Sequence, residues 1–296
     1  MKTNIFRHLS WFFAAFLLIF TFNSLSEELF AQKGLLWQVE KTGVKPSYLF
    51  GTMHSENPQV TKLLSVVKPY ITKIDTVFLE TELNITAILK SSIALFLTPG
   101  QTLDQLLDQT KYTQLIQILY EHGIPEDFAK TLKPWAIMIM LSSPQQKTGD
   151  ILDLLLYQEA QAQHKKVFGL ETVEEQLAIF EDISLPDQLI LLQETVDQLD
   201  QLSEIFQQML KLYTQRNLTG LLDFSKKYMA SDTNKTLMDT FNKRILDDRN
   251  VKMVERMQTA LQTGNSFIAV GALHLPGKNG ILKLLEQQGY ILTALY

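Results

Sequence analysis

Residues 266–290 read SFIAVGALHLPGKNGILKLLEQQGY, and this stretch predicts a buried strand, a turn and a helix in that order. The apolar run at 267–270 is typical of a short strand inside a sheet. His274 follows Gly271 in the spacing Gly-x-x-His, and the leucine-rich residues 281–285 form the apolar face of a helix. In open α/β sheets, ligands and catalytic groups gather just outside the carboxyl ends of the strands. The stretch therefore predicts an α/β fold and makes His274 a candidate site residue.

The same pattern occurs near the front of the chain, where the apolar residues 48–50 lead into Gly51-Thr52-Met53-His54. With 13 glycines and 5 histidines in 296 residues, chance supplies roughly a fifth of one such match. A glycine lets the backbone turn sharply and lets a ligand approach closely. A histidine offers a nitrogen ligand or a proton acceptor near neutral pH. Two matches at strand ends therefore indicate a functional role for His54 and His274.

The composition is that of a globular protein and argues against nucleic acid as a partner. Apolar residues make up 46% of the chain, charged residues 20%, and the net charge is −5. A basic surface that could bind a phosphate backbone is therefore not expected. The absence of cysteine excludes disulfides, thiolate metal sites and cysteine nucleophiles. The composition specifies neither the substrate nor the oligomeric state.

The first 26 residues have the organisation of a secretory signal. Lys2 and Arg7 precede an apolar run at 11–20, and Ser24-Leu25-Ser26 offers small residues for cleavage. The run is shorter than the ~20 residues that a spanning helix needs. Residues 1–26 are therefore expected to be a signal peptide or, alternatively, an uncleaved membrane anchor. In both cases the folded part lies outside the cytoplasm, in the periplasm or secreted.

The remaining residues, 32–296, alternate short apolar strands with helices and contain no linker or break in composition. We predict a single α/β domain with a central, largely parallel or mixed sheet, flanking helices and a large helical insertion. Thr172 and Glu175 have the spacing of a capping box at a helix start. Strands are expected at 35–39, 48–50, 76–79, 167–170, 267–270 and 291–295, and helices at 58–72, 150–165 and 186–213 and within 85–141 and 218–261.

The glutamine- and leucine-rich segment 186–213 repeats apolar residues at steps of three and four. Such a stripe is what a helix packed on the core needs, and this is the interpretation we favour. The alternative is a helical lid or a surface for a partner.

Four of the apolar runs lead into ionisable residues, namely His54, Glu80, Glu171 and His274. If the strands lie side by side in a parallel sheet, these side chains converge on one edge. Two imidazoles and one or two carboxylates can ligate a divalent metal, and a metal-bound water becomes a nucleophile near neutral pH. Without a metal, a histidine oriented by a glutamate could activate the water itself.

The same residues could instead have purely structural roles. Glu80 and Glu171 are also what a helix cap or a salt bridge uses, and Arg249 could form a surface ion pair. His122 and His164 lie in loop or helix-end contexts and are expected to be exposed. The chain has neither the His-Glu-x-x-His zinc helix nor the Gly-x-Ser-x-Gly elbow, so no standard hydrolase motif decides the matter.

As a set, these motifs resemble those of the TraB/GumN family, which includes the Tiki proteases. The resemblance covers nearly all of the chain after the signal segment, from about residue 35 to residue 296. More remotely, the chain is similar to erythromycin esterases and haem-binding ChaN-like proteins. The motifs are Leu49-Phe50-Gly51-Thr52-Met53-His54, Val77-Phe78-Leu79-Glu80, Gly169-Leu170-Glu171-Thr172 with Glu175-Gln176, Arg249-Asn250, and VGALHLPG at 270–277 through Gly289-Tyr290.

The resemblance implies a Tiki-like metal-dependent hydrolase with a parallel-sheet core bearing helices. Asp153 matches an aspartate on the helix before Glu171. The sequence departs from the usual pattern at His164, where a glycine commonly precedes the lysine, and this puts the local turn in question. By position, the resemblance implies His54, Glu80 and His274 as metal ligands and Glu80, Glu171, Arg249 and Asn250 as catalytic candidates.

The first hypothesis is an exported metallohydrolase of the metalloprotease kind that uses Mn²⁺, Co²⁺ or Zn²⁺ and cleaves a peptide bond. Glu80 would then be a ligand or the general base, and Arg249 would stabilise the oxyanion. The second hypothesis is non-catalytic capture of a peptide signal or haem in the same cleft. A third, weaker one is a metal-free esterase that works through a histidine base.

Overall fold

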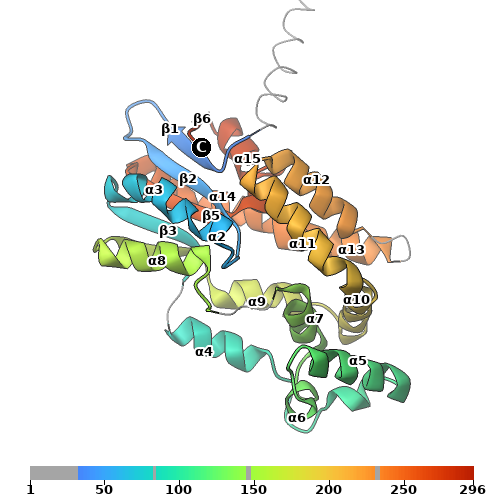
Figure 1. The fold of residues 1–296 in the computed structure, drawn as a ribbon. Coiled ribbons are helices and arrows are strands. Elements are labelled where there is room, and N and C mark those ends of the chain that lie inside the picture. The colour runs from blue at the N-terminus through green and yellow to red at the C-terminus, as the bar shows by residue number, and fades with distance from the viewer. Residues whose placement is uncertain (1–32, 83–84, 145–147, 231–233) are drawn as a thin grey trace, which may run out of the picture.

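The computed structural model describes residues 33–82, 85–144, 148–230 and 234–296, and these form a mixed six-stranded sheet flanked by helices (Figure 1). The expected signal segment, residues 1–26, lies outside these ranges. Within them, no helix combines the length and the apolar character that crossing a bilayer requires. In their order across the sheet, the strands are β4 (Lys166–Glu171), β3 (Thr76–Thr81), β5 (Ser266–Gly271), β2 (Ser47–Thr52), β1 (Leu36–Glu40) and β6 (Ile291–Ala294).

The sheet confirms the predicted α/β class and each predicted strand to within a few residues. Strands β2, β5, β3 and β4 run parallel, while β1 pairs antiparallel with β2 and β6 pairs antiparallel with β1. Strand β5 is buried from Ser266 to Val270. A parallel strand covered on both faces needs such a continuous apolar run, which is why residues 267–270 lack polar alternation. The carboxyl ends of all four parallel strands therefore lie at one edge of the sheet.

Helices cover the sheet and build a second lobe below it in the view of Figure 1. Two insertions contribute to this lobe, one between β3 and β4 and one between β4 and β5, where the sequence predicts one large insertion. In chain order the helices are α2 (Pro58–Thr61), α3 (Leu63–Thr72), α4 (Ile85–Ala94), η1 (Leu103–Gln105), α5 (Gln109–Glu121), α6 (Glu126–Ala129), α7 (Pro134–Ser142), α8 (Leu152–Ala162), α9 (Val173–Glu181), α10 (Leu185–Asp197), α11 (Leu199–Thr214), α12 (Leu218–Tyr228), α13 (Lys235–Asn242), η2 (Lys243–Asp247), α14 (Asp248–Thr263), η3 (Ala272–His274) and α15 (Ile281–Gln287).

The sheet and the second lobe each have their own cluster of buried apolar side chains. The first surrounds the sheet and includes Phe50 and Phe267 from neighbouring strands. The second lies in the helical lobe, where α7 and α10 contribute Ile137 and Leu191. The two insertions share this second cluster, because helices α7 and α10 are in contact although β4 separates them in the sequence.

Two helices predicted as continuous are interrupted in the structure. The expected helix at 58–72 is divided at Lys62 into α2 and α3. The expected helix at 186–213 is divided at Gln198, whose φ of −102° and ψ of 0° leave the helical region. The N–H of Gln198 bonds the carbonyls of Thr195 and Val196, so the end of α10 is satisfied locally. Neither interruption carries a glycine, nor a proline at the break, so the sequence gives no local signal for it.

The turn before β4 accounts for the unusual residue at position 164. His164 has a φ of 55°, in the left-handed region that a glycine occupies without a steric penalty. Histidine is among the residues that tolerate this conformation, and His164 is exposed as predicted. The turn therefore forms with histidine in place of the glycine that the family pattern favours.

The capping box predicted at the start of α9 is present. The Thr172 hydroxyl accepts from the Glu175 N–H at 3.2 Å, and Glu175 Oε2 accepts from the Thr172 N–H at 2.9 Å. Arg256 of α14 donates to both carboxylate oxygens of Glu175 and also to the Leu170 carbonyl. These contacts connect the start of α9 to α14 behind the end of β4.

Glu175→Gln should lower the free energy of unfolding by about 1 kcal/mol at pH 7, because glutamine keeps the cap but loses the charge facing Arg256. The hydrogen bond with Arg256, followed by that with Thr172, lowers the pKa of Glu175 from 4.5 to about 2. A depressed carboxyl pKa adds stability above the unfolded value, and this is lost as the pH falls toward the folded one. Urea denaturation from pH 7 to pH 2 should therefore show the difference between wild type and variant disappear between about pH 4.5 and 2. A difference independent of pH would contradict this.

Candidate functional site

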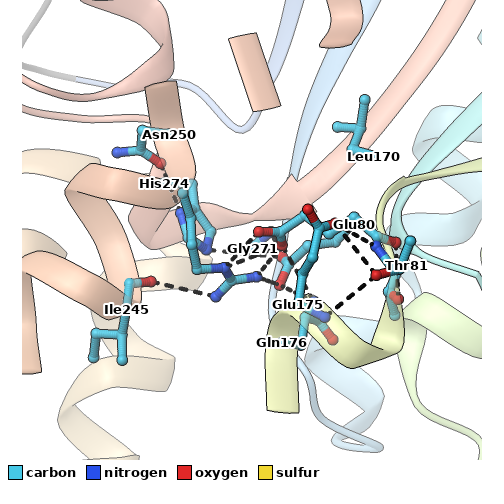
Figure 2. A network of polar contacts seen from close by, with 12 residues as sticks. Glu80, Thr81, Leu170, Glu175, Gln176, Ile245, Asn250, Gly271 and His274 are labelled. Carbon is cyan, nitrogen blue, oxygen red and sulfur yellow. Dashed lines mark hydrogen bonds and ion pairs between the residues drawn. The ribbon is translucent and has the colours of Figure 1, made fainter. Parts of the chain in front are cut away.

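The carboxyl ends of the parallel strands bring most of the predicted site residues into one network (Figure 2). Glu80 is the penultimate residue of β3, Glu171 ends β4, and His274 follows β5 on η3. Arg249 and Asn250 reach the same place from the first turn of α14. The network therefore joins residues from segments that lie up to 194 positions apart, from Glu80 to His274, as the convergence of parallel strands predicts.

Arg249 holds the two glutamates together. Its Nε lies 3.0 Å from each carboxylate oxygen of Glu171, and its Nη2 lies 2.6 Å from Glu171 Oε2 and 2.5 Å from Glu80 Oε1. Burial alone lowers the pKa of Arg249, but its bonds to Glu171 and Glu80 outweigh this and raise it, so the guanidinium stays charged. The Glu171 side chain is 3% exposed, which makes this a buried ion pair and not the surface pair that the sequence left open for Arg249.

Glu80 is held in its ionised form. The Gly271 N–H donates to Glu80 Oε2 at 2.8 Å, and Gln176 Nε2 donates to Oε1 at 3.2 Å. Burial on its own raises the pKa of this carboxyl, but the Arg249 charge and the hydrogen bonds from Arg249 and the Gly271 N–H hold it below its usual range. A side chain on the Gly271 Cα would approach Glu80 Oε2 to 3.3 Å. The glycine of the second Gly-x-x-His element therefore lets the backbone approach the carboxylate.

His274 is oriented by a chain of amides. Asn250 Nδ2 donates to the Asn279 carbonyl at 2.9 Å, which directs Asn250 Oδ1 to His274 Nδ1 at 2.7 Å. Because that oxygen only accepts, Nδ1 carries the proton and Nε2 keeps its lone pair. This Nε2 lies 3.9 Å from Glu80 Oε2. The His274 side chain is buried, and burial lowers its pKa, so the neutral imidazole is favoured.

His54 lies apart from this network, beside Asp153 of α8. His54 Nδ1 is 3.5 Å from Asp153 Oδ2, and the Thr52 hydroxyl donates to Asp153 Oδ1 at 2.8 Å. The hydrogen bond with Asp153 outweighs burial and raises the pKa of His54. The His54 side chain is 68% exposed, while His274 is buried. Asp153 is thus a partner of the first Gly-x-x-His element.

The helix that carries Arg249 is irregular just before it. Residues Lys243–Asp247 form one π-helical turn between α13 and α14, and Arg249 Nη1 donates to the Ile245 carbonyl at 3.3 Å. Such turns occur frequently at functional sites, because the added residue rotates the following side chains relative to those before it. No residue pattern in 243–247 predicts this turn.

Two further residues of the site were not predicted as such. Gln176, in the first turn of α9, donates to both Glu80 and Glu171. Gln176 follows the strand-end Glu171 by five residues, at the start of the next helix, and this spacing could have indicated that it contacts the glutamate. The Tyr213 hydroxyl on α11 donates at 2.9 Å to the Gly51 carbonyl in the first Gly-x-x-His element. This contact spans 162 positions, and nothing local to Tyr213 indicates it.

A large cleft opens onto these residues. It has a volume of about 1610 Å³ and is lined by His54, Glu80, Arg249 and His274 at one end and by helices of the second lobe elsewhere. Pockets for drug-sized molecules are about 300–1,000 Å³, so this cleft has room for a longer ligand. The apolar stripe predicted for 186–213 contributes to its wall, and the part of it on α11 is only partly buried. The favoured prediction of a core-facing stripe is thus wrong for Leu202 and Phe206, which line the cleft, whereas Met209 both lines the cleft and packs against the core around the sheet.

The positions of the predicted metal ligands meet only some of the requirements for binding a divalent ion. Among the described residues, no three histidine or acidic side chains gather as a ready metal site. His274 Nε2 and Glu80 Oε2 do lie 3.9 Å apart, less than the sum of two bonds of about 2.1 Å to a shared ion. Asn250 and Asp153 meanwhile contact the Nδ1 atoms of the two histidines, as residues outside a metal's ligand shell do.

Comparison with known proteins gives one family and several relatives. The model of the TraB/PrgY/gumN family matches residues 35–294. The chain is 25% identical over 254 residues to the protein YbaP of Shigella flexneri, a match that covers 82% of this chain and 89% of the relative. It is 23% identical to the metalloprotease TIKI1 of Danio rerio and 25% identical to the metalloprotease TIKI2 of Xenopus tropicalis. These matches cover 86% of this chain but only 62% and 58% of those relatives.

No solved structure matches the chain. The family match extends over nearly every described strand and helix, and it includes both Gly-x-x-His elements and the glutamates of the network. On this evidence the chain belongs to the TraB/PrgY/gumN family.

Proposed function

We propose that the protein is an exported, metal-dependent hydrolase that cleaves peptide bonds in the cleft beside Glu80 and His274. The observation that carries the proposal is the placement of an ionised, partly buried carboxylate 3.9 Å from a neutral, oriented imidazole at the end of a peptide-sized cleft. The similarity to the Tiki metalloproteases supports the reaction class. Export and the signal peptide or anchor at residues 1–26 remain part of the proposal.

The metal, Mn²⁺, Co²⁺ or Zn²⁺, would be held by His274 and Glu80, with His54 as the third ligand. When bound, such an ion supplies Lewis-acid stabilisation and an acidic water. The protein's own residues set the orientation and the protonation state of His274 and Glu80. Asn250 keeps Nε2 of His274 free of a proton, and Glu80 stays ionised and able to accept a hydrogen bond or a proton from water.

Arg249 and Glu171 fit a positioning role in this proposal. Three Arg249 nitrogens already donate to Glu80, Glu171 and the Ile245 carbonyl, so a single Nη1 hydrogen is left for an oxyanion. The ion pair instead fixes the Glu80 carboxylate in the orientation that faces His274. A carboxylate misplaced by about 1 Å can reduce turnover by roughly 10²-fold.

Non-catalytic capture of a peptide or haem is the second candidate. It is favoured by the absence of a three-ligand group among the described residues, because capture needs only the shape of the cleft. The His54–Asp153 pair is the feature that a metal-free esterase would use, as an oriented histidine base.

Incubating the protein with a mixture of peptides of varied sequence, and analysing the products by mass spectrometry, distinguishes these functions. Metal-loaded protein should cleave peptides, chelation should abolish cleavage, and Mn²⁺, Co²⁺ or Zn²⁺ should restore it. Peptides that bind but stay intact in the metal-loaded protein would contradict the hydrolase and favour capture. Ester hydrolysis that survives chelation would favour the histidine base.

A further inference from the structure

The charges that line the cleft are strongly unbalanced. Among the described residues that line it, Arg249 is the only lysine or arginine, and that guanidinium is already paired with Glu80 and Glu171. Five acidic residues line the same space. They are Glu56, Glu80, Glu121, Asp153 and Asp200.

Two of these carboxylates face the cleft without a basic partner among the described residues. Glu121, at the end of α5, accepts only from the Gln117 amide at 2.9 Å, and it lies at the helix end where the dipole disfavours a negative charge. Asp200 is exposed in the first turn of α11 and takes part in none of the ion pairs. Glu121 lies on α5 and Asp200 on α11, and none of the hydrogen bonds of the Glu80–His274 network involves either residue. The negative charge is therefore not part of the catalytic network alone.

Between the carboxylates the walls of the cleft are apolar. Helix α11 presents one such wall, with side chains one turn apart along it, and helices α5, α7, α9 and α13 supply others. A ligand that fills this space must cover apolar surface and at the same time bring positive charge to the acidic positions. The apolar side chains of these walls are Ile118, Ile139, Phe180, Leu199, Leu202, Phe206, Met209, Leu210 and Phe241.

We propose that the cleft selects cationic amphipathic peptides, with apolar side chains against α11 and lysine or arginine side chains near Glu121 and Asp200. As a statement about a substrate it rests on the proposed peptide hydrolysis, and as a statement about binding it stands on the lining itself. Clefts lined by one sign of charge concentrate ligands of the opposite sign. The same lining disfavours anionic ligands such as haem, because its propionates would meet carboxylates.

The test is binding of two matched fluorescent peptides to the full-length Glu80→Gln protein, in which turnover is suppressed. The peptides share every leucine and differ only in carrying lysine or glutamate between them. We expect the lysine peptide to bind about 10-fold more tightly at low salt, and the preference to shrink at high salt. Asp200→Asn combined with Glu121→Gln should weaken binding of the lysine peptide by roughly 3- to 10-fold, as the loss of two exposed ion pairs would.

The control is Asp197→Asn combined with Glu204→Gln. It removes the same net charge from exposed residues of α10 and α11 that do not line the cleft, and it should change binding by less than about 2-fold. Equal binding of the two peptides, tighter binding of the glutamate peptide or of haem, or equal effects of the two double variants would each overturn the proposal. Wild-type protein that binds the lysine peptide without cleaving it contradicts the hydrolase but not the charge preference. Cleavage without charge preference contradicts the preference alone.

Discussion

Arg249→Met should lower the free energy of unfolding by about 3–5 kcal/mol, one of the two largest effects we expect from a single substitution. Methionine fills a similar volume but leaves the buried Glu171 carboxylate without the guanidinium that pairs with it, and among the described residues the Gln176 amide is then its one side-chain donor. The cost arises from an uncompensated buried charge and not from the loss of a favourable contact alone. Chemical denaturation monitored by circular dichroism measures it.

Arg256→Met is the matched control, because Arg256 lies two turns later on α14 and pairs with Glu175 at the surface. It should cost about 1 kcal/mol or less. Neutralising the orphaned carboxylate as well, in the double variant Glu171→Gln with Arg249→Met, should recover a large part of the lost stability. Equal destabilisation by Arg249→Met and Arg256→Met would show that the buried ion pair does not hold the strand ends together.

Glu80→Gln should reduce peptide turnover by roughly 10²- to 10⁴-fold and leave peptide binding largely intact. The variant keeps the shape of the side chain and can still accept from Arg249, but it cannot carry the negative charge that faces His274 Nε2. Turnover and peptide affinity should be measured in parallel, with the same peptide.

Glu175→Gln is the control for this substitution, since it removes a nearby carboxylate of depressed pKa that does not line the cleft. Its turnover should match that of the wild type. If Glu80→Gln weakens binding and turnover together and to the same extent, Glu80 is part of a capture site and its proposed chemical role is wrong.

The positions of the strands could be predicted from the sequence because their cause is local. Apolar runs such as 267–270 are short, bounded by glycine or polar residues, and separated by helices, so a largely parallel core follows from chain order. The antiparallel pairing of β6 with β1 does not follow from it. The convergence of Glu80, Glu171 and His274 then follows from the geometry of parallel strands, before any contact is known.

The partners of these residues could not be predicted, because they depend on packing between distant segments. The pairing of Arg249 with Glu171 crosses 78 positions, and the contact of Thr52 with Asp153 crosses 101. The π-helical turn before Arg249 and the interruption at Gln198 also have no local signal, since tertiary packing imposes both. The cleft-facing position of Leu202 and Phe206 on α11 could not be predicted either, because periodicity identifies an apolar face but not what that face meets.

Metal binding by the purified protein tests the central claim most directly, measured as stoichiometry and affinity for Mn²⁺, Co²⁺ and Zn²⁺ beside His54→Ala and His274→Ala. We predict one divalent ion per chain in the wild type and its loss in both variants, with each variant folded as judged by circular dichroism. A folded wild-type protein that takes up none of the three metals would contradict the metallohydrolase. Binding that survives in His54→Ala but not in His274→Ala would remove His54 from the ligand set.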